Sequence, residues 1–306
     1  MIKGLELAKK YYEEYGAAMI HDKFGGLESR IAVGLVGEGS ECFGYDDEYS
    51  RDHDFGPSFC MWLTEEDFAK YGKALEDEYA KLPSEFMGLP TRNTRELAIG
   101  RVGVLQTEAF YAYIAGTASV PEDNLDWLKM NEFRLAAATN GRVFRDNLGR
   151  FTELRQGFLA YYPEDVRKKK IAACLAHMAQ SGQYNYPRCM NRGEKEAAFL
   201  MFGDFVRQSL HVIYLLNKTY EPFDKWAFRK LDELPLLKNA QAKLRQVISL
   251  PGGKAAMIES ICNDVMTELK RQGLSSSPDD FLIAQAIEVM RRIEDVRLRR
   301  MDMMQG

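Results

Sequence analysis

The stretch from residue 31 to residue 63 constrains the fold more than any other part of this chain. It begins with the apolar run Ile-Ala-Val-Gly-Leu-Val at residues 31–36, which is typical of a buried strand, and continues into the small-residue turn Gly-Glu-Gly-Ser. A second strand is predicted to begin near Asp52. Because side chains alternate along a strand, Asp52 and Asp54 are expected on one face and His53 on the other.

The residue types in this stretch suit a site for a metal ion and phosphate groups. Gly39 and Ser40 end the turn, and eleven residues separate them from Asp52. A turn with exposed backbone amides can bind phosphate oxygens, and Ser40 would add a hydroxyl group. Two carboxylates on one face repel each other unless a cation or an arginine neutralises them, and a divalent cation would also bridge to phosphate. The alternative is an ordinary turn followed by a solvated strand start.

These residues resemble the signature of a known superfamily. The Gly39-Ser40 turn after an apolar strand, followed by Asp52-His53-Asp54, is similar to the motif of the nucleotidyltransferases, which include the aminoglycoside and lincosamide enzymes and have a polymerase-beta-like fold. The flanking residues and residues 215–226 look closer still to a bacterial group of two-domain proteins that is filed as a domain of unknown function. The resemblance covers most of the chain.

The resemblance implies roles for particular residues. Asp52 and Asp54 would be catalytic and would hold Mg²⁺ or Mn²⁺, while Gly39, Ser40 and Lys225 would bind the triphosphate of ATP or another nucleotide. The implied reaction transfers AMP from ATP to a hydroxyl group of a small molecule and releases pyrophosphate. Two alternatives stay open. The acceptor could be a protein or a tRNA, or the protein could bind a nucleotide or a partner with weak or no catalysis.

The sequence departs from the superfamily pattern at its third carboxylate. That acid is usual on a later strand, and its position here looks to be Gly103. Glu96 and Glu108 flank this strand and could replace it, although loop and helix-start roles explain both equally well. The base could instead come from the helical half, where Glu194 and Asp204 are candidates.

Two segments of the helical half combine cations with aromatic residues. A predicted turn between helices, residues 180–192, carries Arg188 and Arg192, which could grip a phosphate. Tyr220 and Lys225 belong to the second segment, and the resemblance implies that this segment faces the nucleotide. The structural alternatives are a polar turn and a surface lysine beside a core aromatic residue.

Composition excludes several classes of protein. The formal net charge of −4 argues against a general nucleic-acid binder, although a local basic groove would be compatible with it. The five cysteines form no CxxC pair, so neither a disulfide framework nor a zinc site is indicated. The chain shows neither a signal-peptide pattern nor a membrane-length apolar run, and we expect a cytoplasmic protein.

Periodicity predicts an α+β protein of two domains. Residues 1–118 should form a small mixed-sheet domain, with a helix over 3–16 that stops at Gly16, a helix from Thr64 to about Ala80, and a third strand over 97–105. Residues 119–306 should form an all-α helical bundle without strands. Its helices are predicted over 131–139, 163–180, 191–217, 222–231, 235–249, 253–272 and 278–301.

Overall fold

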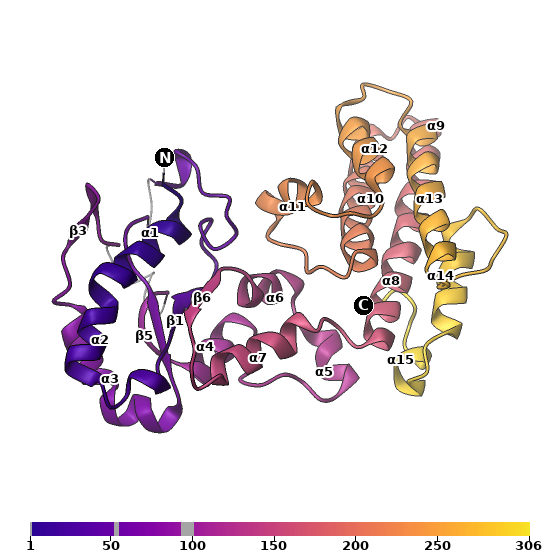
Figure 1. The fold of residues 1–306 in the computed structure, drawn as a ribbon. Helices are drawn as coiled ribbons and strands as arrows, with labels where there is room; N and C mark the ends of the chain where they lie inside the picture. The colour runs from indigo at the N-terminus through magenta and orange to yellow at the C-terminus, as the bar shows by residue number, and fades with distance from the viewer. Residues whose placement is uncertain (1, 52–54, 93–100) are drawn as a thin grey trace. The chain divides into compact units, whose positions relative to one another are not determined.

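The structure is a computed structural model that describes residues 2–51, 55–92 and 101–306 (Figure 1). It contains two compact units. The N-terminal unit comprises Met1–Pro121 and Met130–Ala160, and the helical unit comprises Glu122–Lys129 and Tyr161–Gly306. The predicted boundary at residue 118 differs from this division, because residues 142–145 form a strand in the sheet of the N-terminal unit.

A four-stranded mixed sheet forms the centre of the N-terminal unit. Its order is β5-β2-β1-β6. The central strand β1 pairs antiparallel with both of its neighbours, whereas β2 pairs parallel with β5. The prediction of a small mixed sheet is confirmed. The strands are β1 (Ala32–Leu35), β2 (Cys60–Leu63), β5 (Gly103–Gln106) and β6 (Arg142–Arg145).

Strand β6 contradicts the prediction that no strand follows residue 121. It is only four residues long and partly exposed, so it lacks the apolar run that identified β1. Gly34 allows its close approach, because a Cβ at Gly34 would lie 2.4 Å from the backbone oxygen of Arg142. The pairing of β6 with β1 therefore requires a glycine in β1, which the sequence of β6 does not reveal.

Helices cover both faces of the sheet. Along β2 and the residue before it, Phe59, Met61 and Leu63 belong to one hydrophobic core, which also includes residues of α1 and α2. On the opposite face, the Trp62 ring stacks on Phe151 at 3.9 Å between ring centroids. Burial on both faces explains why β1 and β2 are apolar at every position instead of alternating.

The first helix extends beyond its predicted end at Gly16. It runs as α1 (Gly4–Tyr11), a π-helical turn η1 (Tyr12–Gly16) and α2 (Ala17–Phe24). Gly16 is a packing glycine and not a helix stop, because a Cβ there would lie 2.4 Å from the ring of Phe59. The remaining elements of this unit are η2 (Glu28–Arg30), η3 (Tyr49–Arg51), α3 (Glu65–Tyr79), β3 (Glu85–Phe86), β4 (Leu89–Pro90), α4 (Thr107–Ile114), α6 (Glu132–Thr139) and α7 (Arg150–Leu159).

Helix α8 (Glu164–Met178) is the central helix of the helical unit and packs against α10 and α14 (Figure 1). It continues into a π-helical segment η5 (Ala179–Asn185) and then into α9 (Tyr186–Arg192), so the turn predicted at residues 180–192 is wrong. The other helices are α5 (Asn124–Lys129), α10 (Lys195–Leu216), α11 (Asp224–Leu231), α12 (Lys238–Ser249), α13 (Lys254–Arg271), α14 (Leu282–Arg291) and α15 (Val296–Arg300). Among the helices that the structure describes, none is long and apolar enough to cross a membrane.

The helix predicted over residues 278–301 is interrupted between α14 and α15. The Asp165 carboxylate accepts hydrogen bonds from the backbone N–H groups of Glu294 and Asp295, at 2.9 and 2.7 Å. Asp295 then caps α15 by accepting from the backbone N–H of Arg297. A carboxylate distant in sequence thus supplies the hydrogen bonds that an uninterrupted helix would have supplied.

Lys169 is a fully buried cation in α8. Its ammonium group donates hydrogen bonds to the backbone oxygens of Asp302 (2.8 Å), Met303 (3.2 Å) and Gln305. Burial lowers the pKa of Lys169 from its ordinary value of 10.5 to about 8. This side chain therefore links the last turn of the chain to the central helix.

Lys169 is expected to make the stability of the protein rise between about pH 8 and pH 10.5. In that range the unfolded chain keeps the lysine proton that the folded state has lost, so the free energy of unfolding increases with pH. Urea unfolding at pH 7.5 and pH 9.5 would measure the effect, with Lys169→Met as the comparison. An equal pH dependence in both proteins would contradict this assignment.

Candidate functional site

The turn after β1 is held in place by the residues that follow α6. We refer to residues 37–42 as the Gly–Ser turn. The side chain of Asn140 donates to the backbone oxygen of Gly37 at 2.7 Å and accepts from its N–H at 3.1 Å. The N–H of Gly141 donates to the backbone oxygen of Cys42 at 2.8 Å. Both ends of the turn are therefore fixed by one short segment, residues 140–141.

Glu41 folds back over this turn and is buried together with Arg92. Its side chain is 6% exposed, that of Arg92 is 8% exposed, and the two form an ion pair. The carboxylate lies so close to Gly39 that a Cβ there would be 2.2 Å from a carboxylate oxygen. Gly39 is therefore required for packing, in addition to any role in binding phosphate.

The structure brings the chain neighbours of the two motif halves together. Asp52 and Asp54 lie outside the described residues, but Phe55, which follows Asp54, is described. A Cβ at Gly4 would lie 2.5 Å from the Cβ of Glu41 and 3.3 Å from the ring of Phe55. The residue after the Gly–Ser pair and the residue after the Asp-x-Asp motif therefore pack on the same position of α1.

Arginine side chains surround the Gly–Ser turn. Arg101 forms an ion pair with Glu38 at 3.5 Å, and Arg155 donates to the backbone oxygen of Asn140 at 2.6 Å. Burial lowers the pKa of Arg155 below its ordinary value. For Arg92, burial acts in the same direction, but the neighbouring Glu41 carboxylate raises the pKa above its ordinary value. Three arginines therefore lie at this turn or at the segment that holds it, and two of them are paired with glutamates of the turn.

The candidates for a third carboxylate are not equivalent. Glu108 accepts a hydrogen bond from Nε of Arg150 at 3.0 Å, so its charge is already paired. Gly103, the position where the acid was expected, begins β5 opposite Cys60 and has a positive φ of 93°. Glu96 lies outside the described residues.

The candidates in the helical unit occupy three separate local environments. Tyr220 is buried and packs against the rings of Tyr161 (4.7 Å) and Tyr162 (5.1 Å). Lys225, in the first turn of α11, is exposed and lies 5.3 Å from the ring of Trp226. Arg188 stacks on the ring of Tyr184. These contacts give Tyr220 a structural role in addition to the binding role that was predicted.

The remaining candidates lie on or before the helices around residue 200. Glu194 is the exposed residue that precedes α10, and Arg192 is exposed at the end of α9. Asp204 accepts a hydrogen bond from Gln208 one turn later on α10, at 3.5 Å.

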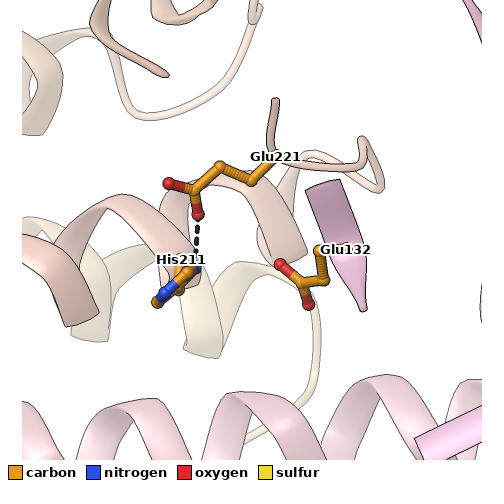
Figure 2. Close-up of side chains that lie close together, drawn as sticks. All are labelled: Glu132, His211 and Glu221. Carbon is orange, nitrogen blue, oxygen red and sulfur yellow. Dashed lines mark ion pairs between the residues drawn. The ribbon is translucent and has the colours of Figure 1, made fainter. Parts of the chain in front are cut away.

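The helical unit contains a histidine–carboxylate pair that no sequence pattern predicted. Nδ1 of His211, on α10, forms an ion pair with Oε2 of Glu221, which follows the helix and is 1% exposed (Figure 2). Such a pair fixes the orientation of the imidazole ring. The spacing of ten residues matches no metal-ligand motif, so the sequence offered no signal for it. Figure 2 also draws Glu132, which belongs to the N-terminal unit.

Comparisons with known proteins find a matching family and a protein of similar structure. Residues 127–227 match the family described as "Domain of unknown function (DUF4037)". The chain is similar in structure to a nucleotidyltransferase-like protein from Exiguobacterium sibiricum, at 10% sequence identity and a TM-score of 0.38, over 94% of this chain and 80% of that chain. No curated protein matches.

The family match includes some of the site residues and not others. It contains Asn140, which bonds to Gly37 of the Gly–Ser turn, Arg155, which bonds to Asn140, and Lys225 of the helical unit. It does not contain the Gly–Ser turn itself or Asp52 and Asp54. The Gly–Ser turn and the Asp-x-Asp motif therefore lie outside the residues that match the family.

Proposed function

We propose that this protein is a metal-dependent nucleotidyltransferase that transfers AMP from ATP to a hydroxyl group of a small molecule and releases pyrophosphate. The observation that carries the proposal is the shared packing of Glu41 and Phe55 on Gly4. This packing brings the neighbours of Ser40 and Asp54 to one place, as a site built from both motif halves requires. The arginines at the Gly–Ser turn place guanidinium N–H groups, which suit phosphate oxygens, beside it.

In this proposal the backbone N–H groups and the Ser40 hydroxyl bind phosphate oxygens, and Asp52 and Asp54 hold Mg²⁺ or Mn²⁺. The described residues fit that division, because Glu38 and Glu41 are each paired with an arginine and leave the metal to the two aspartates. The metal would stabilise negative charge on the phosphates. The acceptor oxygen forms a bond to the α-phosphorus, the bond to the pyrophosphate oxygen breaks, and the hydroxyl proton passes to a base or to water.

Calorimetric titration tests the proposal directly. An ATP analogue with a methylene bridge between the α- and β-phosphates, in the presence of Mg²⁺, is titrated into the wild-type protein and into Asp54→Asn. We expect metal-dependent binding that the variant loses, since one carboxylate less leaves the cation with too few anionic ligands. Equal binding by both proteins, or no binding of any nucleotide by the wild type, would overturn the proposal.

A second candidate function is nucleotide binding without transfer. The pairing of Glu108 with Arg150 favours it, because this acid is then a poor replacement for the third carboxylate. It predicts the same titration result but no pyrophosphate release with any acceptor. A pyrophosphate release assay with hydroxyl-bearing acceptors separates the two functions.

A further inference from the structure

Arg92 contacts residues that follow each half of the motif in the sequence. Its side chain pairs with Glu41, the residue after Ser40. Its backbone lies against Gly56, the second residue after Asp54, where an added Cβ would be 2.9 Å from the nitrogen of Arg92 and 2.3 Å from the oxygen of Pro90. Arg92 therefore contacts the Gly–Ser turn through its side chain and the segment after Asp54 through its backbone.

The guanidinium group of Arg92 has binding capacity that the described residues do not use. Nη2 pairs with Glu41, but the buried Nε has no hydrogen-bond partner among residues 2–51, 55–92 and 101–306. The neighbouring thiols add no negative charge, because burial raises the pKa of Cys60 to about 12 and the pKa of Cys42 well above its ordinary value. A buried donor without an acceptor costs free energy, and an anion bound beside it would remove that cost.

We propose that Arg92 binds the phosphate chain of the nucleotide and that Glu41 is the residue that positions its guanidinium group. The inference rests on the proposed function and adds a binding residue to it. The planar guanidinium fork suits phosphate oxygens, and Glu41 limits its orientation by holding Nη2. The same contact explains the glycine at position 39, which leaves room for the Glu41 carboxylate.

Arg92→Lys tests the binding role with little change in charge. Lysine keeps the positive charge but loses Nε and the planar fork. Loss of one charge-assisted hydrogen bond corresponds to about 10- to 100-fold weaker binding, and we expect that loss for the methylene-bridged ATP analogue and for inorganic triphosphate. Adenosine has no phosphate, so any binding of adenosine should be unchanged. If the substitution merely disturbed the fold, the affinity for all three ligands would fall together.

Arg145→Lys is the matched control. Arg145 also forms an ion pair with a glutamate of the same unit, Glu28, at 2.7 Å. In the sheet, however, Arg145 lies opposite Val33, at the end of β1 that is farther from the Gly–Ser turn. This variant should bind all three ligands as the wild type does. If Arg92→Lys binds the ATP analogue as tightly as Arg145→Lys does, Arg92 is not a phosphate ligand and the proposed function stands without it. A wild-type protein that binds no nucleotide would overturn the proposed function and this inference together.

Glu41→Gln tests the positioning role. Glutamine can still accept a hydrogen bond from Arg92 but holds it less firmly, so we expect a smaller loss of affinity for the ATP analogue than in Arg92→Lys, again with adenosine unchanged. Unchanged affinity for the ATP analogue would show that Glu41 does not position Arg92. If Arg92→Lys does not fold, the double variant Glu41→Gln/Arg92→Gln removes both buried charges and should show the same selective loss of phosphate binding.

Discussion

Replacing Glu41 with alanine is expected to lower the free energy of unfolding by about 3–5 kcal/mol. The substitution leaves the guanidinium group of Arg92 buried without its carboxylate partner, and an uncompensated buried charge is among the most destabilising defects in a folded protein. The cost would be far lower for an exposed pair, because water would solvate the remaining charge.

Urea unfolding at neutral pH measures this effect. Glu28→Ala is the matched control, because Glu28 is 31% exposed and pairs with Arg145, which is 18% exposed; it should lose much less stability than Glu41→Ala. The double variant Glu41→Ala/Arg92→Met should recover part of the stability that Glu41→Ala loses, since no buried charge remains. A loss below about 1 kcal/mol in Glu41→Ala would mean that Arg92 finds water or another acceptor.

Gly141→Ala is expected to destabilise the N-terminal unit by roughly 3 kcal/mol, from backbone strain and a steric clash. Gly141 has a φ of +65°, which residues with a Cβ rarely adopt, and the new Cβ would lie 2.1 Å from the backbone oxygen of Leu35. Moving residue 141 would also shift Asn140 and so loosen the Gly–Ser turn.

Gly149→Ala separates these two contributions. Gly149 has a similar φ of +82°, but a Cβ there would meet nothing within 4 Å. Gly149→Ala should therefore lower the free energy of unfolding by the backbone strain alone, about 1 kcal/mol. Thermal unfolding of both variants gives the comparison. Equal losses would show that strain alone acts at Gly141 and that the contact with Leu35 relaxes.

The sequence predicted the elements that carry a local signal, such as an apolar run or a helix cap. The apolar run at residues 31–36 identified β1, and Thr64 followed by acids identified the start of α3, where the Thr64 hydroxyl accepts a hydrogen bond from the N–H of Asp67. These signals are local. The helix interruption before Asp295 was missed because Asp165, which accepts the hydrogen bonds there, is distant in the sequence.

In the candidate site, too, the residues with a local sequence signal were predicted and those that depend on distant contacts were not. Gly39 and Ser40 were recognised because their spacing from the aspartates is a local property of the chain. Glu41 and Arg92 were missed, since a pair separated by 51 positions leaves no periodic signal and each residue reads as an ordinary surface charge. Asn140 follows the helix predicted over residues 131–139, and its two hydrogen bonds to Gly37 depend on a contact across 103 positions.

The interleaved order of the two units has a consequence for synthesis and for truncation. Strand β6 is the last strand of its sheet in the sequence, so β1 keeps an unpaired edge until residue 145 has left the ribosome. A protein truncated at residue 118 would retain that exposed edge permanently, together with the apolar surface that α7 covers at Trp62. Such a fragment should aggregate, whereas one extended through residue 160 would contain every strand that pairs with β1.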